Sequence, residues 1–280
     1  MSCRLPPSLE EVALDAFSLT KWYLDVVDDE GRSAIAYWSE IAWGPLSLGW
    51  ESVSLRGASG PAVHRSRPAR SAAPCRAAGQ IAWESGALGC RVTCDPWCPS
   101  FRARLLDIPG GVLDWCCEVP GGQATADAGD GCVVRGTGYA ERLVLTLLPW
   151  RLPISELRWG RWISPATRRS IVWIGWRGDH PLTLVLDCGE PAEAAVVDDG
   201  VVRFGSARAG GAGVLRLDRP ETLHARRLSD ILQGVRPLSR RLPRAWQAVE
   251  DRKTRSRGVL NAGQAAPDTG WAIHELVRFP

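Results

Sequence analysis

Apolar and polar residues alternate along most of the chain. In "KWYLDVV", residues 21–27, Trp22, Leu24 and Val26 share one side of a predicted strand. The same pattern recurs in both halves, from "IAYWSEIAW" and "VLDWCCEV" to "YAERLVLTLL", "SIVWIGWRG" and "GWAIHELVRF". Turn signals such as "DDEGR" and "DDG" separate these segments, and Asp-Gly between apolar runs favours hairpins. The pattern predicts an all-β protein made of antiparallel barrels or sandwiches.

In one segment the apolar residues recur at the spacing of a helix. Pro243 can occupy a first helical turn, and "RAWQAVEDRK" follows, with Leu242, Trp246 and Val249 on one face. We expect a short helix near the C-terminus whose mixed-charge face is solvated.

The length of 280 residues fits two β domains. A stretch rich in Gly, Ala and Asp over 119–137 precedes the predicted boundary near residue 145. We therefore predict an N-terminal β domain over 15–145 and a C-terminal β domain over 146–280.

The charge is nearly balanced, with 34 basic and 31 acidic residues and a net charge of +3. This balance argues against a nucleic-acid-binding protein, which gathers uncompensated positive charge on one face. Only Lys21 and Lys253 are lysines, and the other basic residues are arginines, which pair with carboxylates and stack on aromatic rings. The basic stretch 59–74 favours a solvated loop, while contact with a membrane surface stays open.

Cysteine usage indicates reduced thiols. Cys90, Cys94 and Cys98 are spaced by four, without the second Cys or His pair of a zinc site, so we expect no metal. Reduced cysteines fit a cytoplasmic protein. The N-terminal stretch does not resemble a secretory signal, and no run reaches membrane-spanning length. Peripheral contact with the inner membrane is left open.

Three segments, "VLDWCCEVP", "GTGYAERL" and "ELRWGRW", resemble the carotenoid 1,2-hydratase (hydroxyneurosporene synthase) group and its AttH-like, lipocalin-like relatives. "KWYLDVVDDEGRSAIAYWSE" and "GWAIHELVRF" fit the broader group. The resemblance implies two tandem lipocalin-like (calycin) antiparallel β-barrels. It also implies a hydrophobic small-molecule ligand, such as an isoprenoid or polyene, and no metal or organic cofactor.

The resemblance also implies site residues. In carotenoid hydratases the corresponding strand has a Tyr-x-Asp pair whose acid is thought to protonate the substrate double bond, and Tyr139 and Glu141 match this pair. An upstream His-x-Trp pair maps to Leu113 and Trp115, so the histidine is missing here. A related reaction on another substrate, or no reaction, therefore stays open.

The chemistry can be stated from the residues alone. Adding water to an alkene starts with proton transfer to carbon from an acid that is still protonated near neutral pH. A carboxyl group in an apolar pocket can do this because burial raises its pKa. Aromatic faces then stabilise the cation by about 0.5 to 2 kcal/mol each. Tyr139 and Glu141, two residues apart on one strand, share a face. Trp115 lies opposite them if segments 112–118 and 137–147 pair.

Each of these residues also has an explanation as part of the structure alone. Glu141 is at least as well explained by a salt bridge to Arg142, Arg158 or Arg161, although Arg142 should face away from it. For Tyr139 and Trp115, ordinary core packing is favoured.

Four further residues are predicted to bind substrate. Trp159 and Arg161 are expected where the two barrels meet. His274, in the final strand, is either a satisfied core histidine or a polar group lining the pocket. Glu40, in an aromatic strand, is a candidate second polar anchor.

The sequence thus favours a cofactor-independent hydratase or a cyclase-type lyase or isomerase acting on an isoprenoid or carotenoid-like molecule. A non-catalytic lipid or polyene carrier of the same fold is the main alternative, and a structural protein with a filled barrel is a third.

Overall fold

The computed structural model describes residues 17–57, 62–68, 71–129, 131–206, 211–227, 243, 248–263 and 266–279. These residues form strands β1 to β19 and one 3₁₀ turn, Pro149–Arg151, with no α-helix among them. No helix in the described part of the chain has the length and apolar character needed to cross a membrane.

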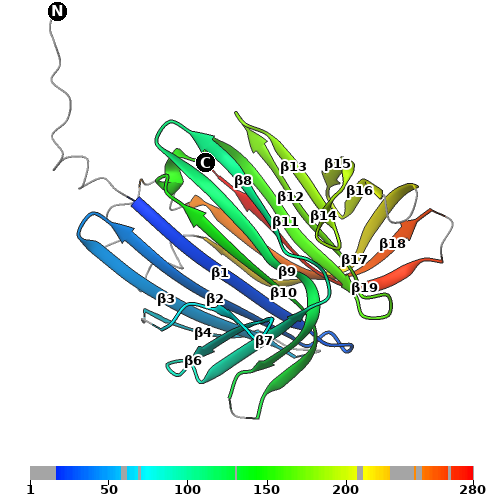
Figure 1. Ribbon diagram of the computed structural model, residues 1–280, viewed down its shortest axis with the longest axis horizontal. Coiled ribbons are helices and arrows are strands. Elements are labelled where there is room, and N and C mark those ends of the chain that lie inside the picture. Colours follow the sequence, from blue (N-terminus) through cyan, green and yellow to red (C-terminus); the bar gives the residue numbers. More distant parts are fainter. Residues whose placement is uncertain are drawn as a thin grey trace, which may run out of the picture.

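The strands form two sheets, which lie against each other in Figure 1. The N-terminal sheet contains β1 (Phe17–Val27), β2 (Ser33–Trp43), β3 (Leu46–Arg56), β4 (Val63–Pro68), β5 (Cys75–Ala77), β6 (Gln80–Ser85), β7 (Cys90–Pro96), β8 (Phe101–Ile108), β9 (Gly111–Asp127) and β10 (Val133–Leu145). The C-terminal sheet contains β11 (Ile154–Ser164), β12 (Arg169–Gly178), β13 (Leu182–Asp187), β14 (Glu190–Pro191), β15 (Glu193–Asp198), β16 (Val201–Ser206), β17 (Gly211–Arg227), β18 (Glu250–Ala262) and β19 (Asp268–Arg278).

The order of strands is regular. The N-terminal sheet runs β4-β3-β2-β1-β10-β9-β7-β6-β5, with β8 also paired to β9, and the C-terminal sheet runs β14-β13-β12-β11-β19-β18-β17-β16-β15. The central pairings, such as β1 with β10 and β11 with β19, are antiparallel. The predicted all-β fold of two antiparallel, barrel-like sheets is confirmed. The predicted division into domains over 15–145 and 146–280 stays a prediction.

The predicted C-terminal helix is not seen among the described residues. Leu242 and Trp246 lie outside the described residues, and the end of "RAWQAVEDRK" from Glu250 onward belongs to β18. This strand pairs with β17 on one side and β19 on the other. Hydrogen bonding to both neighbours decides its conformation, against a local spacing that suits a helix.

Alternation along the central strands creates three buried layers. On β1, Trp22, Leu24 and Val26 point into the curl of the N-terminal sheet, whereas Tyr23 and Val27 point toward the other sheet. The curl of the C-terminal sheet has its own core, which includes Trp162, Trp173 and Phe204. Between the sheets lies a third layer, here called the inter-sheet core, made of Phe17, Tyr23, Val27, Ile35, Leu106, Leu113, Trp115, Cys117, Tyr139, Leu145, Leu147, Ile154, Trp159, Ile163, Val172, Ile174, Trp176, Leu186 and Ile273.

An ion pair crosses the inter-sheet core. Asp25 of β1 and Arg161 of β11 both have 0% side-chain exposure. The Nε of Arg161 donates to both Asp25 carboxylate oxygens, at 3.0 and 3.1 Å, and its Nη2 makes a further bond to Oδ1. Its Nη1 donates to the backbone carbonyl of Trp271 at 2.9 Å. The guanidinium group therefore ties one sheet to the other through directional bonds.

We predict that Asp25→Asn lowers the free energy of unfolding by about 3 to 5 kcal/mol, because it leaves the Arg161 charge buried without its partner. Urea denaturation followed by circular dichroism measures this. The double variant Asp25→Leu/Arg161→Met should fall much less, since it removes both charges. As a control, Arg203→Gln breaks a pair with Asp198 in which both side chains are about half exposed, and should cost about 0 to 1 kcal/mol. Equal effects of Asp25→Asn and Arg203→Gln would contradict the structural role of the buried pair.

Candidate active site

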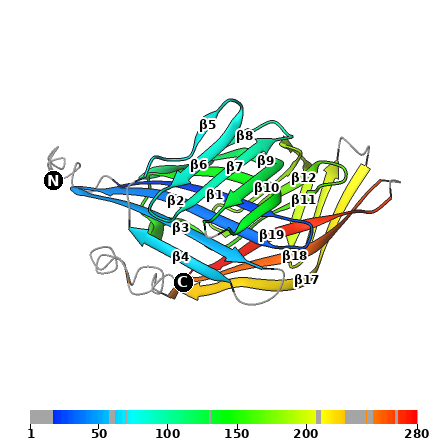
Figure 2. The same cartoon turned by 90° about the horizontal axis from the view of Figure 1, so that it is seen from below.

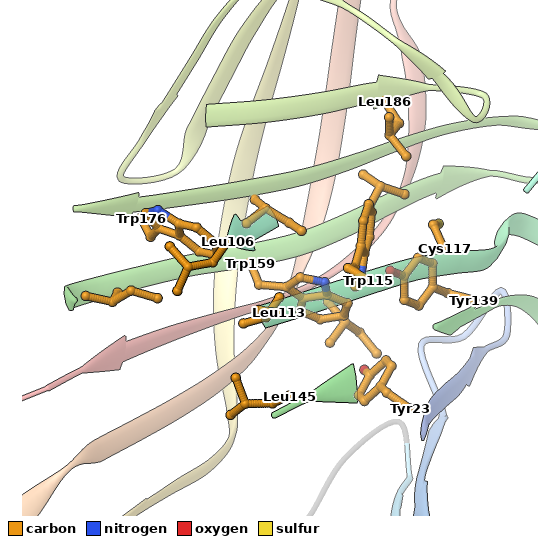
Figure 3. Close-up of a cluster of buried hydrophobic side chains, with 14 of the residues drawn as sticks. Tyr23, Leu106, Leu113, Trp115, Cys117, Tyr139, Leu145, Trp159, Trp176 and Leu186 are labelled. Carbon is orange, nitrogen blue, oxygen red and sulfur yellow. The ribbon is translucent and has the colours of Figure 1, made fainter. Parts of the chain in front are cut away.

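Glu141 lies at a convergence of three hydrogen-bond donors. Its Oε2 accepts from Trp115 Nε1 at 2.6 Å, from the Tyr139 hydroxyl at 2.7 Å and from Trp159 Nε1 at 3.1 Å. The first two come from β9 and β10, which pair as the placement of Trp115 opposite Glu141 requires, and Trp159 comes from β11 across the inter-sheet core. Figure 3 shows Trp115, Tyr139 and Trp159 gathered in this core. The structure therefore brings together four of the predicted site residues.

None of the three arginines weighed as partners forms an ion pair with Glu141. Arg142 faces away, as predicted, with its Nε 3.9 Å from Glu118. Arg158 pairs with Glu156 at 2.8 Å and also with Asp199. Arg161 is engaged with Asp25. Neutral donors, not guanidinium groups, therefore surround Glu141.

Aromatic rings close this cluster. The Trp159 ring lies 4.9 Å from that of Tyr23 and 5.4 Å from that of Tyr139, both edge-to-face. Burial raises the pKa of Tyr139, and the neighbouring Cys117 and Glu141 raise it further, so its hydroxyl stays protonated and can donate. We call Glu141 with these rings the aromatic cluster.

An open cleft lies beside the aromatic cluster, between strands β1 to β4 of the N-terminal sheet and β17 to β19 of the C-terminal sheet. Its volume is about 640 Å³, and Figure 2 shows β3 and β4 of one sheet beside β17 and β18 of the other. Glu141 is not among the residues that line it. The lining residues are Leu19, Lys21, Tyr37, Ser39, Trp50, Ser52, Ser54, His64, Ser66 and Pro68 from the N-terminal sheet and His224, Asp251 and Glu275 from the C-terminal sheet.

Lys253 connects the cleft to the aromatic cluster. Its side chain is 1% exposed, and its ammonium group pairs with the carboxylate of Glu275. The same Nζ lies 4.6 Å from the centre of the Tyr23 ring and 4.8 Å from that of Trp159. The charge of Lys253 is thus held between a carboxylate at the cleft and aromatic faces behind it.

Two carboxyl groups at the cleft have pKa values displaced in opposite directions. Burial raises the pKa of Glu275, and the nearby Asp251 charge adds to this, against the opposing effect of Lys253. Burial alone would raise the pKa of Asp251. The hydrogen bond with His224 (3.1 Å) and the charge of Lys253 outweigh burial and lower this pKa to about 2. A pair of carboxyl groups with separated pKa values is a typical arrangement for an acid and a base in one site.

The remaining predicted residues lie elsewhere. Arg161 is buried in its pair with Asp25. Glu40 is exposed, and alternation along β2 places it on the opposite face from Tyr37. His274 lines a separate cavity of about 180 Å³ together with Trp159, Trp173 and Glu275. Its Nε2 lies 2.9 Å from the hydroxyl of Ser256.

Asp251 and Lys253 are not predicted as site residues from the sequence, because helical spacing places them on the solvated face of a helix. As part of β18, Asp251, Lys253 and Arg255 alternate onto one face. The sequence does contain a signal for this strand: three ionisable residues recur at every second position, shortly before the aromatic final strand. Among the described residues, no group of three or more His, Cys, Asp or Glu side chains is arranged to hold a metal ion.

Comparison with known proteins relates the fold to solved structures. Neither a protein-family model nor a curated protein matches the sequence significantly. The structure is similar to that of CghA with Sch210972, with a TM-score of 0.53 and 11% identity over 94% of this chain and 89% of that one. A protein assigned as AttH from Nitrosomonas europaea (TM-score 0.44, 10% identity, 94% and 92% coverage) and kievitone hydratase from Nectria haematococca (0.47, 11%, 96% and 92%) are also similar. At these identities the likeness to CghA is one of fold, and the other two scores are too low to support more.

The buried histidine gives a pH-dependent prediction. Burial, and then the charge of Lys253, lower the pKa of His274 to about 4 from an ordinary value of 6.5. The unfolded chain therefore binds a proton between these values that the folded chain does not, so the stabilisation is present above pH 6.5 and is lost as the pH falls through 4. At about 1.4 kcal/mol per pKa unit, the full loss is about 3.5 kcal/mol.

We expect His274→Gln, which can still hydrogen-bond to Ser256, to lose less stability than the wild type between pH 7 and pH 4. Urea titrations at both pH values measure the difference. His180→Gln, at an exposed turn, is the matched control and should follow the wild type. Parallel pH dependence of the wild type and His274→Gln would contradict the assigned shift.

Proposed function

We propose that the protein is a cofactor-independent acid–base enzyme of the hydratase or cyclase type, acting at a C=C bond of a small molecule held in the inter-sheet cleft. The observation that supports this most directly is the pair Glu275 and Asp251 at the cleft, with pKa values displaced in opposite directions. CghA, which has this fold, is known in complex with Sch210972. A protein of this fold therefore binds a ligand, which is consistent with a ligand-binding cleft in the present protein.

The cleft suits an amphipathic substrate. Leu19, Trp50 and the ring of Tyr37 offer apolar and aromatic surface, against which the expected isoprenoid body can pack. Serines on β2, β3 and β4 and the imidazole of His64 offer hydrogen bonds on the same wall. A substrate with an apolar chain and some oxygen-containing groups uses both kinds of surface.

In the proposed reaction Glu275 is the proton donor. Burial and the charge of Asp251 raise its pKa, which favours the protonated form that can donate. The proton moves to one alkene carbon, and water attacks the other carbon. The proton released by that water returns to the carboxylate, which restores the acid. Lys253 stabilises the Glu275 carboxylate in the interval, and the rings of Tyr37 and Trp50 face the developing cation. In a cyclisation, a second double bond of the substrate replaces water as the nucleophile, and the new carbocation loses a proton from a neighbouring carbon to the Glu275 carboxylate.

Glu141 was the donor predicted from the sequence, and that role stays a prediction. It lies in the aromatic cluster, and the residues that line the cleft do not include it. We propose instead that Glu141 is a positioning residue. By accepting from Trp159 it fixes the ring against which Lys253 rests, and so the position of Lys253 beside Glu275.

A non-catalytic carrier of lipids or polyenes is the second candidate. The observation that favours it is the close ion pair between Lys253 and Glu275, which opposes protonation of the carboxyl group. In a carrier this pair would serve only to satisfy two buried charges at the base of the cleft.

We predict that Glu275→Gln lowers kcat about 10²-fold or more on an acyclic carotenoid or other prenyl substrate, because an amide cannot donate the proton. Substrate affinity should change by less than about threefold, since the amide keeps the shape of the side chain. Turnover is measured by chromatography of the product and affinity by equilibrium titration. Glu84→Gln, on an exposed position of β6, is the matched control.

Three other outcomes have definite meanings. Full turnover by Glu275→Gln rules out Glu275 as the donor. If Glu141→Gln loses turnover while Glu275→Gln keeps it, the donor is Glu141. Ligand binding by the wild type without turnover on any of these substrates favours the carrier.

A further inference from the structure

Two arginines meet on strands that also line the cleft, although neither arginine is among its lining residues. Arg255 of β18 donates from Nη2 to Glu221 Oε2 at 2.5 Å, and Nη2 of Arg56, at the end of β3, lies 3.5 Å from the same oxygen. Arg56 also donates from Nη1 to the backbone carbonyl of Thr222 at 2.7 Å. One carboxylate oxygen therefore lies between two guanidinium groups that come from different sheets. We call these three residues the arginine clamp.

The clamp has more donors than acceptors. Nε of Arg56, and Nε and Nη1 of Arg255, are buried and have no hydrogen-bond partner among the described residues. Arg255 is only 1% exposed, and its guanidinium group lies 5.1 Å from the Trp271 ring. In the buried guanidinium group of Arg161, by contrast, every nitrogen donates a hydrogen bond. A buried cation with unused donors is unfavourable, so the clamp is suited to a further acceptor.

The clamp and the cleft lie along the same three strands. On β3, Arg56 is two residues beyond Ser54, which lines the cleft, and therefore points to the same side. On β18, Arg255 follows Asp251 and Lys253 at spacing two. On β17, Glu221 precedes His224, another lining residue, across a register shift. All three strands thus continue from the cleft into the clamp.

We propose that Arg56 and Arg255 bind a carboxylate of the substrate, and that Glu221 occupies the position of this group while the cleft is empty. Glu221 is 44% exposed, so its side chain can turn outward and uncover both guanidinium groups. Arginine pairs with planar carboxylates through two parallel hydrogen bonds, which would use the unpaired donors. The substrate class is therefore an amphipathic acid, with its carboxylate in the clamp, its chain along the cleft and its reacting bond beside Glu275. This identification rests on the proposed function of the cleft.

The test compares dodecanoate, dodecanol and dodecyl phosphate by isothermal titration calorimetry with the full chain. The wild type should bind dodecanoate about tenfold or more tightly than dodecanol, the scale expected for a charge-assisted hydrogen bond. Arg56→Gln should reduce this preference to less than about threefold. Glu221→Gln should increase the affinity for dodecanoate and leave that for dodecanol unchanged. Arg203→Gln, at an exposed position of β16, is the control and should keep the wild-type preference.

Equal affinity of the wild type for the acid and the alcohol overturns the proposal, as does an unchanged preference in Arg56→Gln with an unchanged melting temperature. Tighter binding of dodecyl phosphate than of dodecanoate overturns the assignment to a carboxylate. The preference should persist in Glu275→Gln, because Glu275 lies outside the clamp. Absence of turnover on every substrate, with the acid preference intact, would therefore refute the proposed reaction and leave the arginine clamp standing.

Discussion

The contact between Asp25 and Arg161 fixes how the two sheets meet. Both side chains are completely buried, and either charge alone in the inter-sheet core would be strongly unfavourable. The pair is satisfied only when β1 and β11 cross at one relative position. Two residues earlier on each strand, Tyr23 and Trp159 then come into edge-to-face contact at 4.9 Å. The same placement brings Trp159 to Glu141 and Lys253 to the back of both rings.

The candidate site follows from this packing because it belongs to neither sheet alone. The wall with Tyr37, Trp50 and the serines comes from the N-terminal sheet, whereas Asp251 and Glu275 come from the C-terminal sheet. Lys253 lies where they join, paired with Glu275 and backed by Tyr23. A change in the relation of the sheets would separate the two carboxyl groups from the wall of the cleft that faces them.

Much of the fold was predictable because alternation is a local property. The pattern "KWYLDVV" identified the two faces of β1, and the spacing of Tyr139 and Glu141 placed both on one face with Trp115 opposite, as the hydrogen bonds confirm. Alternation does not say what each face packs against. The sequence analysis therefore could not tell that Tyr139 faces the other sheet and not the inside of its own.

The unpredicted part of the site lies where tertiary pairing overrides local pattern. Glu250–Lys253 ends a segment with helical spacing, but these four residues pair with β17 and β19 as part of β18. β17 itself runs through Pro220, with register shifts on either side of Glu221, so its sequence does not look like one long strand. The ionisable residues of the cleft and the clamp that the sequence did not reveal lie on β17 (Glu221 and His224) and on β18 (Asp251 and Lys253). Their proximity becomes clear only once the pairing of β17 with β18 is known.

The buried charges are better explained by positioning than by stability. An apolar inter-sheet core would hold the sheets together at least as strongly, since replacing a buried ion pair by packed apolar side chains is often neutral or stabilising. Apolar surfaces, however, tolerate small sliding movements, whereas a guanidinium group bonded to two carboxylate oxygens and a carbonyl does not. A cleft whose proposed catalytic groups and proposed binding wall come from different sheets needs that restriction. The buried pair of Asp25 and Arg161 therefore supplies the fixed alignment that a site shared between two sheets requires.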